Sequence, residues 1–315
     1  MSFLTRNAVI LAKKETTYGT DATPAGANAI LVRNLSVTPQ QAEFADRDVI
    51  RPFYGASESL PTGISAQIEF EVELQASGTL GVAPGWGPLL RACAFAETIT
   101  AGASVAYSPV SSGFESLSLV YSLGSETSTR LLHKLLGARG TVQFVINSKA
   151  IPVMKYRFQG LYSAVVDDTT TLTPDFSAFQ TPLTSNAKNT PTFALHGVSS
   201  PMAEFSLDVA NTLAYRALIG EESIKLTDRK STGSITFDAT SVATKNWWDI
   251  ARYATLGTLD LVHGLTAGKI IELSSSRVQL KDPQYKDDNG IAQLTMGTVF
   301  VPSSAGNDEL LITCR

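Results

Sequence analysis

The stretch from Ile64 to Gln75 constrains the fold more than any other part of the chain. Its residues alternate between apolar and polar, with Ile64 to Leu74 on one side and Ser65 to Gln75 on the other. A period of two is that of a β-strand with one face in a core and the other in water. Glu69, Glu71 and Glu73 on the polar face would lie about 7 Å apart, which requires screening by water. This strand is either part of an ordinary solvated sheet or part of a surface that repels another polyanion.

The alternating strand and a following helix occur twice in the chain. Thr62-Gly63 precedes the first strand, and the helical pattern Trp86 to Glu97 follows it. Thr232-Gly233 precedes a second alternating strand, Ser234 to Asp238, and the pattern Asn246 to Gly257 follows that one. Asn246 is suited to capping its helix with Asp249 at the third position, and Gly257 to ending it. The recurrence indicates a duplicated unit.

A length of 315 residues fits two domains of about 150 residues each. We therefore predict a mainly β fold with two tandem β-sandwich or barrel domains, each with one flanking α-helix. The second copy is shortened, as loop trimming of a duplicated domain would leave it. The expected divisions are an N-terminal arm over 1–30, a first domain over 31–166, a linker rich in Thr, Asp, Pro and Ser over 167–190, and a second domain over 191–315.

Each half also contains a long connection with charged and aromatic residues. These connections run from Thr38 to Pro61 and from Ala210 to Ser231. Loops longer than about 15 residues are uncommon in compact domains and are often functional, so we expect contact devices, with disordered surface insertions as the alternative. The N-terminal arm, irregular in pattern, either frays or orders against a neighbour. The residues expected to make these contacts are Asp46, Arg47, Asp48, Arg51, Phe53, Tyr54, Tyr215 and Arg216.

Composition excludes several classes of function. A net charge of −4 provides no basic surface for tight binding of nucleic acid, and no apolar run approaches the about 20 residues that span a bilayer. Lys13-Lys14 end the apolar run near the start before it reaches signal-peptide length, so we expect folding in the cytosol. Cys93 and Cys314 are expected to be reduced thiols, because two distant cysteines do not make a disulfide framework.

No motif for catalysis, metal binding or a cofactor is found. Gly264 to Ile270 has one residue too few between its glycines for a phosphate loop, and Ile270 stands in place of the metal-binding Ser or Thr. Asp287 to Gly290 lacks the remaining ligands of a calcium loop and is typical of a tight turn. The three histidines have no ligand-spaced partners. We therefore expect neither an enzyme nor a bound metal or cofactor.

Several stretches together resemble the major tail tube proteins of long-tailed, siphovirus-like bacteriophages. They are the run from Ala12 to Ile30, Asp46-Arg47-Asp48, Arg51-Pro52, the helix that begins at Trp86, Gly137 to Val142, Ile151-Pro152-Val153 and Phe158 to Tyr162. The resemblance is densest over residues 1–165. It implies a structural virion protein, built in the host cytoplasm, whose rings stack into the tail tube. It further implies a β-sandwich whose inner sheets join around the ring into a barrel that lines the DNA channel.

Several expectations follow from this resemblance and from the residue patterns together. The polar side chains Gln67, Glu69, Glu71, Glu73 and Asp238 are expected to face a negatively lined lumen. Two tube domains in each chain predict a homotrimeric ring with pseudo-sixfold symmetry, or a homohexamer if the second half is a decoration. The implied partners are other copies of the chain, the tape measure protein, and the tail terminator and distal tail proteins, with DNA present only in transit. The alternative function is a receptor- or carbohydrate-binding β-sandwich module of a virion.

Overall fold

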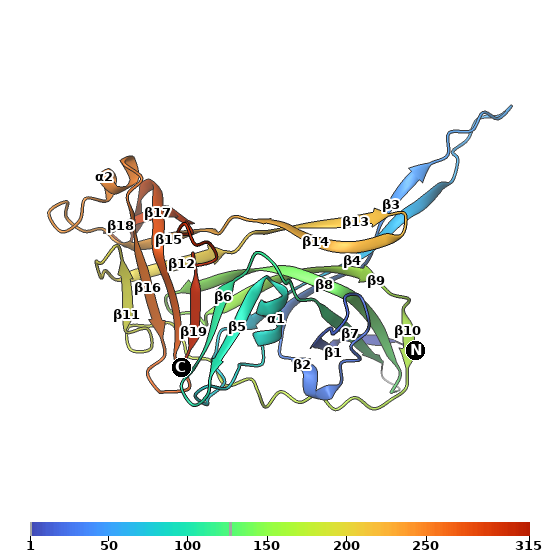
Figure 1. Ribbon diagram of the computed structural model, residues 1–315, viewed down its shortest axis with the longest axis horizontal. Helices are drawn as coiled ribbons and strands as arrows, with labels where there is room; N and C mark the ends of the chain where they lie inside the picture. The colour runs from blue at the N-terminus through green and yellow to red at the C-terminus, as the bar shows by residue number, and fades with distance from the viewer. Residues whose placement is uncertain (1, 126–127) are drawn as a thin grey trace.

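A computed structural model describes residues 2–125 and 128–315 of the chain and shows a mainly β architecture (Figure 1). The elements of the first half are β1(Phe3–Lys14), η1(Gly26–Asn28), β2(Ala29–Ile30), β3(Arg33–Asp46), β4(Ser59–Glu73), α1(Gly87–Ala92), β5(Phe95–Thr100), β6(Ser104–Pro109), β7(Leu117–Ser125), β8(Arg130–Asn147), β9(Val153–Tyr162) and β10(Val166–Asp168). Those of the second half are β11(Thr192–Leu195), β12(Met202–Asp208), β13(Asn211–Leu218), β14(Glu221–Arg229), β15(Thr232–Asp238), α2(Trp247–Arg252), β16(Leu256–His263), β17(Ile271–Asp288), β18(Ile291–Phe300) and β19(Leu311–Cys314). The mainly β fold class predicted from the sequence is confirmed.

Eight antiparallel strands form one continuous layer through both halves of the chain. Their order is β3-β4-β9-β8-β12-β15-β18-β17, and the pairing of β8 with β12 joins the halves. The predicted alternation in β4 is confirmed: Ala66, Ile68, Phe70 and Val72 are buried, whereas Glu69 is exposed. We call this layer the long sheet, and its solvent-facing side the polar face.

The two longest strands each belong to two layers. The first part of β8 pairs with β7 and its last part pairs with β9, with a register shift between Leu136 and Arg139. Similarly, the first part of β17 pairs with β16 and β19, and from Val278 onward the strand pairs with β18, with a register shift between Lys281 and Gln284. A bulge bends a strand and increases its twist, which lets one strand pass from one layer of a sandwich to the other.

The second layer also connects the two halves. β1 and β7 pair beside the first part of β8, and the series β5-β6-β19-β17-β16-β11 covers the rest of the core. The C-terminal strand β19 thus pairs with β6 of the first half. Because β8–β12 and β6–β19 lie in different layers, two separate ladders hold the halves together.

The two halves repeat one order of strand pairing. In the first half the order is β3-β4-β9-β8-β7, and in the second half it is β12-β15-β18-β17-β16. A short helix follows the second strand of each series, α1 after β4 and α2 after β15.

Both helices are shorter than the sequence pattern predicted. α1 ends at Ala92 and α2 at Arg252, and the chain then enters β5 and β16. Ala94 and Ala254 adopt left-handed φ values of 65° and 50°, which stops each helix. Gly257, expected to end the second helix, lies in β16 instead. The predicted cap is present, since the Asn246 side chain accepts a hydrogen bond from the Asp249 N–H at 3.1 Å.

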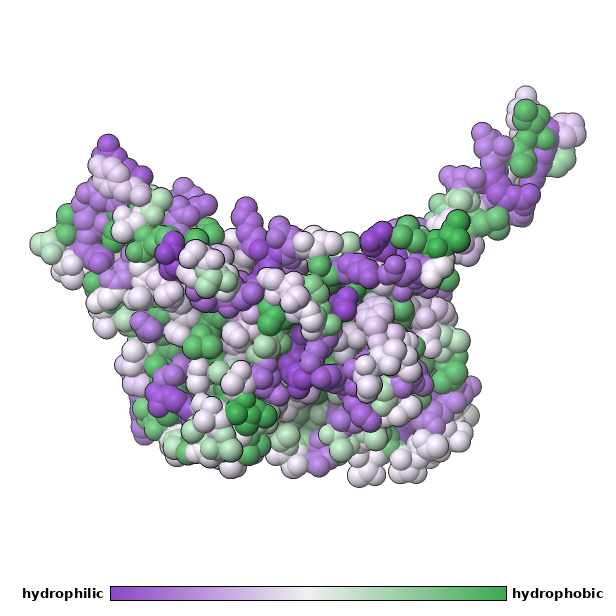
Figure 2. All heavy atoms as spheres, in the orientation of Figure 1, coloured by the Kyte–Doolittle hydropathy of each residue, from purple (hydrophilic) through white to green (hydrophobic). Residues whose placement is uncertain are grey.

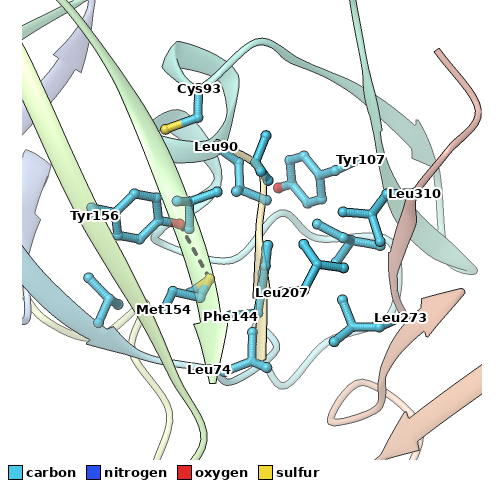
Figure 3. Packing of buried hydrophobic residues seen from close by; sticks show 14 of the residues in the cluster. Leu74, Leu90, Cys93, Tyr107, Phe144, Met154, Tyr156, Leu207, Leu273 and Leu310 are labelled. Atoms are coloured by element: carbon cyan, nitrogen blue, oxygen red, sulfur yellow. Dashed lines mark hydrogen bonds between the residues drawn. The ribbon is translucent and has the colours of Figure 1, made fainter. Parts of the chain in front are cut away.

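A continuous apolar core fills the space between the layers (Figure 3). The largest fully buried side chain, Trp86 at the start of α1, donates its Nε1–H to the Gln75 carbonyl at 2.7 Å. Trp247 of α2 is also buried and bonds Thr240 Oγ1 at 2.8 Å. Buried indole N–H groups need such partners, since an unpaired one would cost about 1–3 kcal/mol. Cys93 and Cys314 are free thiols, as predicted, and both are buried.

Three segments expected to be irregular are ordered. The connection from Thr38 to Pro61 is mostly a long hairpin of β3 and β4, and the connection from Ala210 to Ser231 is the hairpin of β13 and β14. Within the expected N-terminal arm, β1 pairs with β7 and β2. The two connections were misinterpreted because charged, weakly alternating strands lack the apolar period by which a half-buried strand is recognised.

Candidate functional site: a polar face and two projecting hairpins

The polar face of β4 carries four of the five side chains predicted to face a lumen. Glu69 is exposed, whereas Gln67, Glu71 and Glu73 are half-buried. Gln67 donates from Nε2 to Glu69 Oε1 at 2.8 Å. The alternation of β4 places all four side chains on the same side of the sheet, which leaves the opposite side for the core.

The glutamates of β4 face basic residues on the neighbouring strand. Glu69 is opposite Arg157, and Glu71 is opposite Lys155, at 3.7 Å from its Nζ. The other oxygen of Glu71 forms an ion pair with Arg33 Nε at 3.1 Å and accepts a hydrogen bond from Asn34 at 2.8 Å. Partly exposed ion pairs of this kind contribute only about 0–1 kcal/mol each. Their main effect is electrostatic, since this part of the face carries alternating charge rather than uniformly negative charge.

The second half of the polar face carries hydroxyls and carboxylates. Ser206 and Ser234 lie opposite each other with their hydroxyl oxygens 3.0 Å apart. Asp238, the fifth predicted lumen residue, is half-buried at the end of β15 and accepts a hydrogen bond from Gln293 Nε2 at 3.3 Å. Glu204 of β12 is exposed and pairs with Lys286 at 2.8 Å. The polar character of the long sheet therefore continues across the junction of the two halves.

A long hairpin of β3 and β4 projects from the body of the molecule (Figure 2). We call residues 44–60 of this hairpin the arm. Asp46 is the last residue of β3, and Arg47 pairs with Glu58 near the tip. Six large apolar side chains of the arm are exposed: Phe44, Val49, Ile50, Phe53, Tyr54 and Leu60. Exposed apolar groups concentrated on one projection mark a binding surface, whereas scattered ones do not. Asp46, Asp48 and Arg51 are exposed beside them.

The second hairpin, formed by β13 and β14, lies across the end of the first-half sheet (Figure 1). The Ile224 carbonyl accepts a hydrogen bond from Arg139 at 2.8 Å, and the Ile224 N–H donates to the Tyr18 hydroxyl at 2.6 Å. At the hairpin tip, Leu218 and Ile219 are exposed. This hairpin therefore joins the two halves of one chain and still presents an apolar tip to solvent.

Tyr215 and Arg216, both predicted to make contacts between rings, lie on this second hairpin in different environments. Tyr215 is half-buried against Gly63, where an added Cβ would lie 2.8 Å from the Tyr215 hydroxyl. Burial and the Glu222 carboxylate, which accepts a hydrogen bond from that hydroxyl, raise the pKa of Tyr215 to about 12. Arg216, in contrast, is exposed. Tyr215 therefore makes a contact within the chain that sequence patterns did not reveal.

Across 2–125 and 128–315, no group of three or more His, Cys, Asp or Glu side chains is arranged to hold a metal ion. His196 and His263 are largely buried, and burial lowers the pKa of each imidazole. Within the same residues no helix has the length and apolar character needed to cross a bilayer.

The described residues form a β-protein with a large antiparallel sheet, an accessible polar face and two hairpins that expose apolar side chains. A family model described as phage tail tube protein matches residues 5–297, nearly the whole chain. The chain therefore belongs to the phage tail tube protein family. A search of curated proteins finds no match to it. Members of this family are structural components of the virion tail that associate with themselves and with other tail proteins, and they are generally not enzymes.

Proposed function

We propose that this protein assembles into stacked rings that form the tube of a non-contractile, siphovirus-like tail, through which DNA passes into the host. The observation that carries the proposal is the long sheet, whose eight strands run through both halves and whose polar face is accessible. The polar face lines the lumen in this proposal, and the core-facing side and the second layer form the wall. Assembly takes place in the host cytoplasm with the tape measure, tail terminator and distal tail proteins as partners. The protein acts without catalysis and without a cofactor.

The charge pattern of the polar face suits a conduit for DNA. A channel that binds phosphate would slow its cargo, because each cation that neutralises a phosphate adds to the affinity. Lys155 lies beside Glu71, and Arg157 lies opposite Glu69, so the basic groups of β9 have acidic neighbours. In the second half Glu204 is paired with Lys286, and Asp208 of β12 and Asp238 of β15 add negative charge. These charges of the described strands give the proposed lumen little attraction for phosphate, so DNA is repelled or not held.

A charge reversal at Glu69 tests the conduit proposal. Glu69 is exposed, so E69K should fold normally and place a lysine beside Arg157, which creates a pair of free cations in the lumen. Phage carrying E69K should assemble normal tails and eject DNA more slowly, by severalfold at low salt and less at high salt. Asp260 offers a matched control because it is exposed on β16 of the second layer. If E69K and D260K particles eject DNA at the same rate at low salt, the polar face is not the lumen.

The repeated strand order favours a ring of three chains. We propose that residues 31–166 and 191–315 are tandem tube domains joined by 167–190, since β3-β4-β9-β8-β7 and β12-β15-β18-β17-β16 have the same pairing order. Three chains then supply six inner sheets. A homohexamer is the alternative in which the second half decorates the outside, but the long sheet runs unbroken from one half into the other and so favours the trimer.

The arm is the proposed contact between stacked rings. It extends beyond the body and exposes Ile50 and Tyr54 fully, with the charged groups Arg47, Asp48 and Arg51 around them. Interfaces combine buried aromatic groups with a charged rim in this way. In the proposed tube, the arm reaches an adjacent ring and buries its apolar side chains there, with the tip of the β13–β14 hairpin as a further contact.

A further inference from the structure

The long sheet has a free strand edge at each end. β3 pairs only with β4, and β17 beyond Leu280 pairs only with β18, within the part of the chain that the structure describes. Unpaired edges tend to associate with other strands, and proteins commonly protect them with proline. Pro39 and Pro283 interrupt these two edges. On each edge, the residues beside the proline keep backbone groups that can pair.

The chain already contains a junction between equivalent edges. In the repeated order, β8 holds the place of β17, and β12 holds the place of β3. β8 and β12 pair over five residues, including Val145 opposite Ser206. We propose that the β17 edge of one subunit pairs with the β3 edge of a second copy of this chain in the same antiparallel way, so that the β8–β12 junction is the template for the contact between subunits. This inference rests on the proposed ring and specifies its closing contact.

The register of this contact follows from the ladders of the two halves. The β8–β9 hairpin of the first half corresponds to the β17–β18 hairpin of the second half. The last pair of the first hairpin is Val145–Val153, and the last pair of the second is Asp288–Ile291. Asp288 therefore takes the place of Val145.

The position on β3 that faces Asp288 is found from the other strands of the second half. Ser206, the partner of Val145, pairs with Ser234 of β15. Ser234 in turn pairs with Gly297 of β18, which lies six residues after Ile291. The residue six positions after Val153 is Gln159, which pairs with Gln67, and Gln67 pairs with Thr38. Thr38 therefore takes the place of Ser206. The inferred contact places Asp288 of one subunit opposite Thr38 of the next.

The charges along the inferred ladder are compatible with it. β3 has an extra residue between Thr38 and Gln41, so Asp287 faces Pro39 and Gln40. Beyond this bulge the register places Lys286 opposite Gln41, Tyr285 opposite Ala42 and Gln284 opposite Glu43. No two like charges face each other, and like charges directly opposite would destabilise the pairing. These residues are exposed in the single chain, with the exception of Ala42, which is half-buried. Closure around the ring would remove both free edges, as in a barrel.

Oxidative cross-linking of assembled protein tests the register. Facing residues in an antiparallel ladder have Cα atoms about 4.5–5.5 Å apart, which a disulfide spans. A chain carrying T38C and D288C should give covalent dimers and closed trimers on non-reducing gels, at several times the yield of D288C combined with S36C or Q40C. V145C/S206C is the matched control, since the same geometry within one chain should give an intramolecular disulfide. Background should be low because Cys93 and Cys314 are buried.

Microscopy of the same samples separates the two proposals. If rings or tubes are present and V145C/S206C oxidises, but D288C does not cross-link to residues 36–40, the edge contact is wrong and the tube proposal stands. If the wild-type chain forms neither rings nor tubes, both are wrong. Hydrogen exchange of wild-type protein covers the case in which the cysteine variants do not assemble. Amides of 36–40 and 284–288 should exchange at least tenfold more slowly in tubes than in free subunits, and unchanged exchange at both edges would overturn the inference.

Discussion

At the scale of single residues, Glu15 is the least expected feature of the molecule. It follows β1, and its buried carboxylate accepts four hydrogen bonds: from Ser116 Oγ at 2.6 Å, Ser118 Oγ at 3.0 Å, and the N–H groups of Gly19 and Gly137 at 2.8 Å each. Burial of a charge is costly unless such donors compensate it. Glu15 therefore fastens the segment after β1 to β7 and β8.

Replacement of Glu15 should strongly destabilise the subunit. E15A leaves several buried donors without an acceptor, and we expect the free energy of unfolding to fall by about 2–4 kcal/mol. Denaturant unfolding of the isolated subunit measures it. E58A is the control, because Glu58 pairs with Arg47 on the exposed arm and its loss should cost about 0.5 kcal/mol or less. A change in E15A as small as that in E58A would contradict this role.

Residue patterns predicted the alternation of β4 but not the partners of its glutamates. Lys155 and Arg157 alternate with buried Met154, Tyr156 and Phe158 in β9, so the sequence does contain a basic strand face as well as an acidic one. Which strand lies beside β4 depends on long-range topology, which the pattern of one strand does not specify. The contact of Tyr215 with Gly63 was unpredictable for the same reason.

At the scale of elements, the arm is the part whose loss should affect assembly and not folding. Asp46 and Ser59 are opposite each other in the β3–β4 ladder, so an Asn-Gly turn can replace 47–58 and close a shorter hairpin. The shortened protein should fold with unchanged stability, because the removed residues are exposed or half-buried, and should fail to form stacked tubes. Thermal unfolding and electron microscopy measure the two properties.

Point variants separate the side chains of the arm from its length. I50S/Y54S removes two fully exposed apolar groups and should shorten or abolish tubes with less than about 0.5 kcal/mol change in stability. I99S, which removes an exposed apolar group on β5 of the second layer, should leave tube length unchanged. Tubes of normal length from the shortened-arm protein would show that another element stacks the rings.

Elements with strong period-two alternation or a capped helix start were predictable, and charged hairpins were not. The arm and the β13–β14 hairpin were interpreted as loops because exposed strands need no apolar face and so leave little period in the sequence. The helix ends were also missed, since Ala94 and Ala254 carry none of the signals of a residue that adopts a left-handed conformation. The charged and aromatic residues of these segments nevertheless marked them as exposed.

At the scale of the whole molecule, the sequence suggested a duplication from two tryptophan helices and two Thr-Gly strands. The structure adds a repeated order of strand pairing and a single long sheet, which sequence patterns could not supply because pairing between β8 and β12 joins residues about sixty positions apart. If one chain already contains two neighbouring units of the ring, three chains close it.

A reconstruction of the assembled tube at a resolution that separates strands is the most direct test of this account. We predict three chains in each ring, six inner sheets that alternate between two kinds, and a continuous wall in which the polar face of the long sheet lines the channel. A ring of six identical chains, each contributing one sheet to the lumen while residues 191–315 lie outside, would contradict both the trimer and the tandem arrangement.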